Sequence, residues 1–463
     1  MIDAFKESIV KETNARYFGM SEGEMIDNAG KALAKRISEF VKKDSVVSIV
    51  CGLGNNGADG MACARFLKKA GYDPKVLIIG REKDIKSEAA EEHFKLLKKE
   101  KVEYLQDAYA KDIVQSDVVV EALLGVGVKG VLRKRFKDVV NKISRMRAKK
   151  IAIDFPVPGY KPDLILSLIS AKRKTAEVLD IGLPKQVDEY VGPGHVKFLQ
   201  KPKKDSYKSK NGELLVFGGS DLFHGAPLMA TMAASKFIGS VFFYTCPANR
   251  ELVKDMKIKL QEFIVLRDED LEKYSGYANV ILAGPGLEDN VDNKSTLTYL
   301  LNSYPEKVFV LDAYAIAMAN PENNPQNKRG FENCILTPHR GELRHIFKGA
   351  KMTGLEGKLR RFCIENKCDL VLKGSTDLLF SAGGEFRMNK TGNPGMAKGG
   401  TGDVLSGMVA ALACKNDPWE AVMAGTFLNG VAGDEARKEF GYNFSATDLI
   451  PYLQKAYKWA EGF

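Results

Sequence analysis

The sequence lacks the features of a secreted or membrane-spanning protein. Its seven cysteines are an odd number and include no Cys-x-x-Cys pair, so they suggest neither a disulfide framework nor a zinc knuckle. The first residues are charged, and no apolar run that would suit a signal peptide follows them. The richest apolar stretch, residues 118–128, is interrupted by Glu121 and has about half of the ~20 residues that a membrane helix needs. We therefore expect a soluble, cytoplasmic protein with reduced thiols and no membrane partner.

What is present is ordinary globular composition in a long chain. The 463 residues are 44 % hydrophobic and 28 % charged, which excludes disorder as the main state and a single small module as the whole. Lys and Arg exceed Asp and Glu by 10, so an anionic partner is favoured; nucleotides, nucleic acid and acidic membranes all fit that charge. No aromatic ladder or RNA-binding signature accompanies the lysines, and we expect no nucleic-acid partner.

Strand-like and helix-like patterns alternate along both halves of the chain. In the first half the strand-like runs lie at 45–50, 75–79, 117–120, 150–153 and 163–170. In the second half they lie at 213–217, 241–245, 279–283, 307–311, 333–336 and 369–372. This alternation predicts an α/β fold with a parallel sheet in each half. The polar segment 200–212 is poor in apolar residues, so we expect one domain at 1–204 and another at 205–463.

A glycine-rich segment, residues 51–60, follows the first predicted strand as a turn and precedes a helix that we predict at residues 61–70. Gly52, Gly54 and Gly57 have the spacing of a dinucleotide-binding turn, in which glycine lets backbone N–H groups approach phosphate. A plain tight turn is the alternative. The segment Gly54-Asn-Asn-Gly-Ala-Asp-Gly60 is similar to the hallmark loop of the NAD(P)H-hydrate epimerase domain, with one glycine replaced by alanine. The resemblance implies a Rossmann-like three-layer sandwich. It also implies a substrate site that includes Asn55, Asn56, Gly57, Ala58 and Asp59.

Two further segments extend the resemblance to the epimerase domain. Residues 116–130 are similar to the family's strand and phosphate loop, and residues 151–156 match the segment that carries its catalytic aspartate. The resemblance makes Asp154 the candidate acid or base. An aspartate at the carboxyl end of a strand, beside a phosphate loop, is well placed to move a proton near C6 of a nicotinamide ring. A turn or helix-capping aspartate is the alternative. The resemblance assigns dinucleotide binding to Gly125, Val126, Gly127, Val128, Lys129 and Gly130.

The resemblance also implies a potassium site at Asn56, Glu121 and Val157. The family usually has Asp where this chain has Glu121, and Pro-Ser-Gly where it has Pro156-Val-Pro-Gly159. Potassium prefers oxygen ligands, and Val157 can offer only its backbone carbonyl. Potassium binding and full epimerase activity are therefore open. A non-catalytic dinucleotide-binding module is the alternative for the first half.

The strongest pattern in the chain is a second glycine-rich segment. Residues 393–407 read Asn-Pro-Gly-Met-Ala-Lys-Gly-Gly-Thr-Gly-Asp-Val-Leu-Ser-Gly, with Asp403 in the first turn of a predicted helix. Such a loop directs N–H groups at an anion and stabilises a transferring phosphoryl group, while Asp403 can deprotonate a hydroxyl directed at phosphorus. A capped helix start is the alternative. The segment resembles the anion hole of ribokinase-like enzymes, and Gly-Asn-Pro-Gly-Met narrows the resemblance to the ADP- or ATP-dependent NAD(P)H-hydrate dehydratase branch.

Four more segments agree with this branch: residues 218–227, 284–287, 336–342 and 371–375. The resemblance implies a ribokinase-like α/β domain in which Asp403 is the base. It places the hydrated dinucleotide at Ala226, Gly286 and His339. It places the adenine nucleotide at Lys373, Gly374, Ser375, Thr376, Asp377 and Gly402. A core histidine is the alternative for His339, and Asp312 either assists magnesium or caps the next helix.

Together the two resemblances imply a bifunctional repair enzyme. The first half would interconvert the R and S epimers of hydrated NADH and NADPH (NADHX and NADPHX). The second half would dehydrate the S form with ADP or ATP and Mg²⁺. A small-molecule kinase that keeps its phosphorylated product is the alternative for the second half. We expect these dinucleotides and an adenine nucleotide as partners, and a homo-oligomer.

Overall fold

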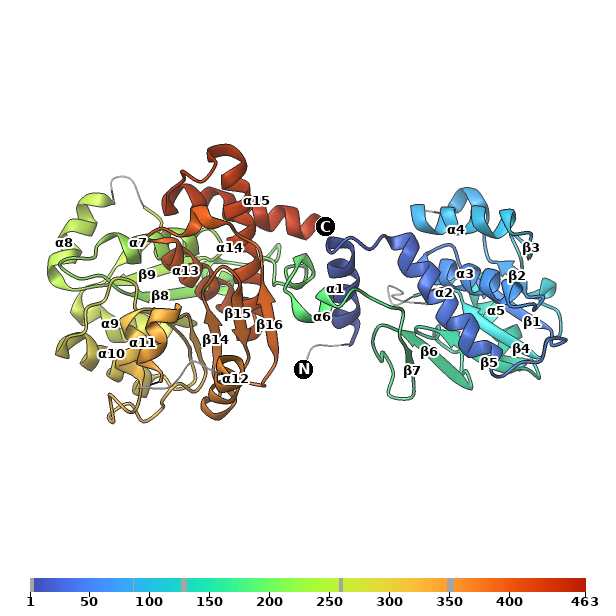
Figure 1. The fold of residues 1–463 in the computed structure, drawn as a ribbon, viewed down its shortest axis with the longest axis horizontal. Helices are drawn as coiled ribbons and strands as arrows, with labels where there is room; N and C mark the ends of the chain where they lie inside the picture. Colours follow the sequence, from blue (N-terminus) through green and yellow to red (C-terminus); the bar gives the residue numbers. More distant parts are fainter. Residues whose placement is uncertain (1–3, 86, 126–130, 258–260, 348–353) are drawn as a thin grey trace. The chain divides into compact units, whose positions relative to one another are not determined.

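The computed structural model describes residues 4–463 except residue 86 and residues 126–130, 258–260 and 348–353. The chain forms two compact units, Met1–Val187 and Asp188–Phe463, each an α/β sandwich with its own sheet (Figure 1). Residues near 200 pack within the second unit, where Gln200 donates its N–H to Oδ1 of Asn416 at 2.7 Å. The compact units meet at Val187 and Asp188, and the border between the functional domains at residues 204 and 205 remains a prediction. None of the helices described here is long and apolar enough to cross a membrane.

The first unit is built around a parallel sheet with the strand order β3-β2-β1-β4-β5-β6-β7. The strands are β1 (Val47–Cys51), β2 (Lys75–Ile78), β3 (Glu103–Leu105), β4 (Val118–Ala122), β5 (Lys149–Ile153), β6 (Leu164–Leu168) and β7 (Glu177–Leu179). The helices are α1 (Ala4–Tyr17), α2 (Glu22–Ser38), α3 (Asn55–Lys69), α4 (Glu88–Lys99) and α5 (Lys134–Arg145). A short helix, α6 (Gln186–Glu189), spans the border between the units.

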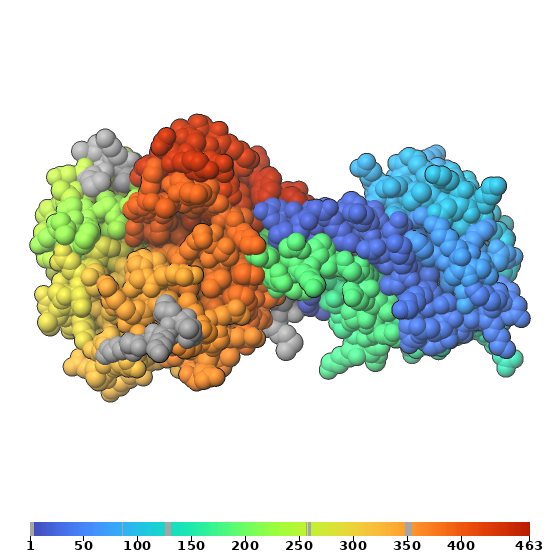
Figure 2. Space-filling view, in the orientation of Figure 1, coloured from blue at the N-terminus to red at the C-terminus, as the bar shows by residue number. Residues whose placement is uncertain are grey.

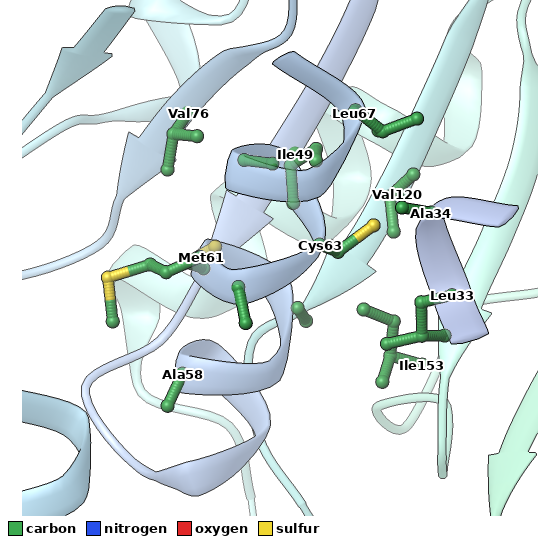
Figure 3. Close-up of a cluster of buried hydrophobic side chains, with 14 of the residues drawn as sticks. Leu33, Ala34, Ile49, Ala58, Met61, Cys63, Leu67, Val76, Val120 and Ile153 are labelled. Carbon is green, nitrogen blue, oxygen red and sulfur yellow. The ribbon is translucent and has the colours of Figure 1, made fainter. Parts of the chain in front are cut away.

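The central strands of the first unit are buried on both faces. Successive side chains of a strand point to opposite faces, so Ile49 of β1 packs with α2, α3 and α4, whereas Val50 packs on the face covered by α5. Ala58, Met61 and Cys63 bring α3 into the first of these clusters (Figure 3). This packing makes the first unit a three-layer sandwich and fixes the start of α3 at the carboxyl ends of β1 and β4.

The second unit contains a nine-stranded sheet with the order β10-β9-β8-β11-β12-β13-β14-β15-β16. The strands are β8 (Glu213–Phe217), β9 (Ser240–Tyr244), β10 (Ile264–Val265), β11 (Val280–Ala283), β12 (Val308–Leu311), β13 (Cys334–Leu336), β14 (Asp369–Leu372), β15 (Asp377–Phe380) and β16 (Phe386–Asn389). The helices are α7 (Gly225–Ser235), α8 (Pro247–Met256), α9 (Leu271–Tyr277), α10 (Val291–Ser303), α11 (Tyr314–Ala319), α12 (Leu355–Asn366), α13 (Thr401–Ala413), α14 (Pro418–Phe440) and α15 (Ala446–Gly462).

This second sheet is parallel from β10 to β14 and antiparallel at β15 and β16. Helices α9 to α12 cover one face, with Leu297, Ala315 and Leu359 in the same core cluster as Ile281 and Phe309. Helices α7, α13 and α14 contact the other face. The loops after β8, β11, β12, β13 and β14 therefore open at one edge, where doubly wound sheets bind their ligands.

Candidate active sites

The first candidate site lies where β1 meets α3. The turn predicted at residues 51–60 is wrong in its second half, because α3 begins at Asn55 and not at Met61. A Cβ on Gly52 would lie 1.7 Å from the carbonyl oxygen of Leu123, and one on Gly57 would lie 2.1 Å from that of Gly52. Only glycine permits this close approach. The helix therefore starts against the sheet, with unpaired N–H groups at its carboxyl edge.

Asn56 and Asp59 are buried polar side chains near the start of α3, and each is 8 % exposed. Burial, followed by the negative charges of Asp154 and Glu12, raises the pKa of Asp59 well above its usual value. The amide nitrogen of Asn56 donates to the carbonyl of Leu124 at 3.3 Å, whereas its Oδ1 is buried without a hydrogen-bond partner. An unpaired buried oxygen is costly unless a ligand or ion satisfies it.

Asp154 is held firmly at the carboxyl end of β5. Its backbone is left-handed, with φ of 62°, a conformation that aspartate adopts more readily than most residues. One carboxylate oxygen accepts the N–H of Leu168 at 3.1 Å and forms an ion pair with Nζ of Lys172. Ser167 donates its hydroxyl to the Asp154 carbonyl at 3.0 Å. The Asp154 side chain therefore forms an ion pair and a hydrogen bond to the neighbouring strand β6, and it does not cap a helix.

Lys172 and Glu12 are two members of this cluster that sequence reasoning missed. The Lys172 side chain is 2 % exposed, and its ammonium group also donates to the carbonyl of Leu168 at 3.0 Å. Glu12 comes from α1, and burial, partly offset by Lys172, raises its pKa. No local pattern marks either residue, because an isolated lysine after a strand and an acidic residue in a helix are both common. The site thus combines the carboxyl groups of Asp59, Asp154 and Glu12 with one ammonium group.

Glu121 lies at the end of β4 and is fully buried. Its two carboxylate oxygens accept the N–H groups of Leu123 at 2.9 Å and Val157 at 3.2 Å. Burial outweighs these hydrogen bonds and raises the pKa of Glu121 to about 7. Among the predicted potassium ligands, Asn56 offers its unpaired oxygen and Glu121 offers carboxylate lone pairs. The apolar side chain of Val157 is buried and contributes no oxygen.

Of the predicted phosphate-loop residues, Gly125 lies within the described part of the chain. Gly125 lies beside Asn56, because a Cβ added to Gly125 would be 3.8 Å from the Cβ of Asn56. The other predicted binding residues, Val126, Gly127, Val128, Lys129 and Gly130, lie outside the described residues.

The second candidate site centres on the start of α13. Gly400 precedes this helix with φ of +97°, and a Cβ there would lie 2.4 Å from the Met229 side chain, so glycine is needed for both shape and space. Asp403 stands in the first turn. Burial, followed by the negative charge of Asp312, raises its pKa from 3.8 to about 7. A carboxyl group with that pKa can accept a proton near neutral pH.

Lys373 and Asp312 form an ion pair beside Asp403. Nζ of Lys373 lies 2.8 Å from Oδ1 of Asp312, and the Asp312 side chain is 4 % exposed. Burial lowers the pKa of Lys373, but Asp312, Glu342 and Asp403 together outweigh burial, so its net pKa shift is upward and it stays charged. A Cβ on Gly402 would lie 3.2 Å from the same ammonium group. The Asp312 carboxylate is thus paired with Lys373 and does not cap the next helix, α11, which has no side-chain cap.

His339 is next to this ion pair and is exposed, not a core residue. It forms an isolated parallel bridge with Lys373, whose N–H donates to the carbonyl of Pro338 at 2.9 Å. Its Nδ1 accepts the N–H of Gly341 at 2.9 Å, and its Nε2 lies 3.4 Å from Oε1 of Glu342. With 58 % of its side chain exposed, His339 can meet a ligand at the carboxyl edge of the sheet.

The predicted nucleotide segment forms the turn between β14 and β15. Oδ1 of Asp377 accepts the N–H of Gly374 at 2.9 Å, and its Oδ2 accepts from Asn389 at 3.1 Å. Asp377 therefore shapes this turn, while Gly374 and Ser375 are exposed on it and Thr376 is half-buried. The orange segment from β14 to α13 reaches the surface of the second unit on the face drawn in Figure 2.

The remaining predicted substrate residues lie at the ends of β8 and β11. Ala226 is in the first turn of α7, and Gly286 has φ of +69°. The two segments are tied together, because Gly219 donates its N–H to the carbonyl of Pro285 at 2.8 Å. A Cβ on Gly286 would lie 2.8 Å from the carbonyl of Phe223. The second sheet thus brings all its predicted site segments to one edge.

Two family models match the chain. The one described as NAD(P)H-hydrate dehydratase matches residues 214–455, and the one described as YjeF-related protein N-terminus matches residues 22–171. The bifunctional NAD(P)H-hydrate repair enzyme Nnr of Archaeoglobus fulgidus is 33 % identical over 474 residues, which cover 96 % of each chain. The enzyme of the same name from Methanocaldococcus jannaschii is 34 % identical over 98 % of this chain and 93 % of its own.

Solved structures resemble the second unit. A ribokinase-like superfamily protein of Enterococcus faecalis has a TM-score of 0.53 and 26 % identity, covering 59 % of this chain and 96 % of its own. The ADP/ATP-dependent NAD(P)H-hydrate dehydratase of Bacillus subtilis, co-crystallised with ATP and Mg²⁺, has a TM-score of 0.50 and 28 % identity, covering 59 % of this chain and 99 % of its own.

The fold and the glycine-rich helix start beside Lys373 and Asp403 define a ribokinase-like enzyme unit, which follows a separate parallel-sheet unit in the same chain. The chain belongs to the family of bifunctional NAD(P)H-hydrate repair enzymes.

Proposed function

We propose that the two units carry out successive steps of one repair. The activities of the family are NAD(P)H-hydrate epimerase and ADP/ATP-dependent NAD(P)H-hydrate dehydratase. In our proposal residues 1–204 interconvert the R and S hydrates, and residues 205–463 dehydrate the S hydrate. The observation that carries the second assignment is the position of Asp403 in the first turn of α13, beside the Lys373–Asp312 ion pair, where burial raises its pKa to about 7.

Asp403 is the proposed base of the dehydratase. Its carboxylate accepts the proton of the C6 hydroxyl while the terminal phosphoryl group of the nucleotide transfers to that oxygen, and the shortened nucleotide leaves. The C6–O bond of the phosphorylated hydrate then breaks. Its electron pair departs with phosphate, the ring nitrogen forms a double bond to C6, and loss of a proton from C5 restores the dihydronicotinamide. A kinase would stop after the first of these steps.

The surroundings of Asp403 suit a transferring phosphoryl group. The N–H groups at the start of α13 and the ammonium group of Lys373 provide positive charge where negative charge develops. Gly402, Lys373, Gly374, Ser375, Thr376 and Asp377 are the proposed nucleotide contacts. Mg²⁺ prefers carboxylate and phosphate oxygens, and Asp312 supplies a carboxylate here. When bound with the nucleotide, Mg²⁺ would neutralise phosphate charge.

The proposed substrate contacts of the dehydratase are Ala226, Gly286 and His339. His339 is exposed beside Lys373, so its imidazole can face the ring of a bound hydrate. The small residues Ala226 and Gly286 leave room for the dinucleotide near the end of β11.

Asp154 is the proposed acid or base of the epimerase. Lys172 forms an ion pair with its carboxylate, and Asp59, whose raised pKa favours the protonated form, lies in the same cluster. One group can therefore accept a proton and another can donate one at opposite stages of the exchange at C6. Asn55, Asn56, Gly57, Ala58 and residues 125–130 are the proposed dinucleotide contacts.

Potassium fits this unit through Asn56 and Glu121. The unpaired Oδ1 of Asn56 and the remaining lone pairs of Glu121 are suitable oxygen donors, and Val157 would add its backbone carbonyl. Bound potassium would supply positive charge near the substrate phosphates. We also propose a cytoplasmic location and a homo-oligomer.

One experiment tests both assignments. A mixture of R and S hydrates is incubated with ADP or ATP and Mg²⁺, and the loss of each epimer is followed together with the products. Restored NADH or NADPH from both epimers supports the proposal. A stable phosphorylated hydrate would make the second unit a kinase, and loss of only the S epimer at the enzymatic rate would leave the first unit without epimerase activity.

A further inference from the structure

A cavity of about 400 Å³ lies at the carboxyl edge of the second sheet, outside the residues assigned above. It is bounded by the ends of β8, β9 and β11 and by the starts of α8 and α10. Its polar lining includes Ser220, Asp221, Thr245, Glu288, Asn290 and Asp292. A cavity of this size is within the range of small-molecule sites.

This cavity lies on the substrate side of the reaction centre. Glu288 follows the segment that contains Gly286, and the cavity-lining Gly219 is hydrogen-bonded to Pro285. In the sheet order, three strand spacings separate β11 from β14, which precedes Lys373. At ~4.8 Å per spacing this is about 14 Å, comparable to the span of an extended dinucleotide. The proposed nucleotide turn follows β14, whereas the cavity lies at the ends of β8, β9 and β11, so the two occupy different strands of the same sheet edge.

The charge of the cavity is negative. Asp221, Glu288 and Asp292 line it, and among the residues that the structure describes none that lines the cavity is Lys or Arg. The nearby Arg250 donates to Asp268 at 2.6 Å and to the carbonyl of Thr245 at 3.2 Å, so its charge is already paired.

The starts of α8 and α10 also bound the cavity and would favour an anion. At α10, however, the side chain of Asn290 caps the N–H of Asn293 at 2.8 Å, and Asp292 adds a negative charge in the first turn. At α8 the first residue is Pro247, which has no N–H, and Asp221 accepts from Cys246 at 3.4 Å. The carboxylates therefore set the sign of the potential.

We propose that this cavity holds the adenosine half of the hydrated dinucleotide and makes the dehydratase prefer NADHX to NADPHX. Its carboxylates accept hydrogen bonds from ribose hydroxyls, as acidic residues do in dinucleotide-binding folds, and repel the 2′-phosphate of NADPHX. Tyr244, half-buried at the end of β9, offers a ring face to the adenine. The proposal rests on the dehydratase function proposed above.

The test is kcat/KM for pure S-NADHX and S-NADPHX with the full-length enzyme. We expect NADHX to be preferred by about tenfold or more, because each carboxylate near a dianionic phosphate contributes about threefold to tenfold at ordinary ionic strength. Asp221→Asn and Glu288→Gln should each lower the ratio of kcat/KM for NADHX to kcat/KM for NADPHX by about threefold to tenfold, mainly by raising kcat/KM for NADPHX.

Asp289→Asn is the matched control, because Asp289 is exposed in the same loop but does not line the cavity. Its ratio should stay within about twofold of wild type, as expected for a more distant, screened charge. Equal use of both hydrates by the wild type, or a ratio that Asp221→Asn and Glu288→Gln leave unchanged, would overturn the proposal. Failure to dehydrate either hydrate would instead refute the dehydratase function on which it rests.

Discussion

The raised pKa of Asp403 predicts that removing its charge stabilises the second unit while destroying its activity. Raising a carboxyl pKa from 3.8 to about 7 corresponds to about 4 kcal/mol of unfavourable ionisation free energy in the folded state. Asp403→Asn removes this cost. The free energy of unfolding of the second unit should therefore rise by as much as about 4 kcal/mol above pH 7, while dehydration of the S hydrate falls by a factor of about 10³ or more.

The pH dependence of this gain has a definite sign. Between pH 3.8 and about 7 the unfolded carboxyl group is ionised while the folded one keeps its proton, so wild-type stability falls as pH rises through this window. The advantage of Asp403→Asn should be about 4 kcal/mol at about pH 8.5 and about 2 kcal/mol at about pH 5.5. For the wild type, kcat/KM should rise with pH and level off above about 7, because the base must be ionised.

Tryptophan fluorescence can follow this unit alone. The chain has two tryptophans, Trp419 and Trp459, and both lie in the second unit. Urea unfolding curves of wild type and Asp403→Asn at the two pH values give the required differences. Equal stability of the two proteins, or a gain that does not change with pH, would refute burial as the cause of the raised pKa. Substantial turnover by the Asn variant would refute Asp403 as the base.

Three other substitutions test neighbouring features. Lys172→Met should lower epimerase kcat about 100-fold or more, because the buried Asp154 carboxylate loses its ion-pair partner, whereas Lys174→Met at an exposed position should leave kcat unchanged; wild-type kcat for Lys172→Met would exclude the ion pair from the epimerase reaction. Gly57→Ala should destabilise the first unit by several kcal/mol without moving the tryptophan-detected transition, because its Cβ would strike a backbone carbonyl; wild-type stability by circular dichroism would contradict the close packing. Lys373→Met should raise the KM for nucleotide more than tenfold, and an unchanged KM would exclude Lys373 from nucleotide binding.

The sequence patterns predicted the central strands of both sheets well. Buried parallel strands such as β4 and β14 are short apolar runs that read clearly. Strands at the sheet edges were missed: β3 and β7 are only partly apolar, and β15 and β16 form an antiparallel pair with mixed side chains. Their existence depends on pairing with a neighbour, which no local pattern encodes.

The candidate sites were predictable where glycine is required by geometry. Neighbouring atoms approach Gly52 and Gly400 too closely for any other residue, and each of these glycines belongs to a glycine-rich motif that can be recognised in the sequence. The start of α3 was placed too late, because the glycines and asparagines of residues 54–57 favour a turn locally and packing against β1 extends the helix through them. Lys172, Glu12 and the acidic cavity arise from distant segments that only the fold brings together.

The most direct measurement of the central claim is the fate of a pure R hydrate. With ADP or ATP and Mg²⁺, the full chain should convert R-NADHX completely to NADH, faster than the spontaneous change of R to S allows. Asp154→Asn should slow this conversion to the spontaneous rate but leave S-NADHX dehydration unchanged, whereas Asp403→Asn should allow epimerisation without NADH formation. Conversion of R-NADHX by Asp154→Asn at the wild-type rate, or NADH formation by Asp403→Asn, would contradict the two-step account.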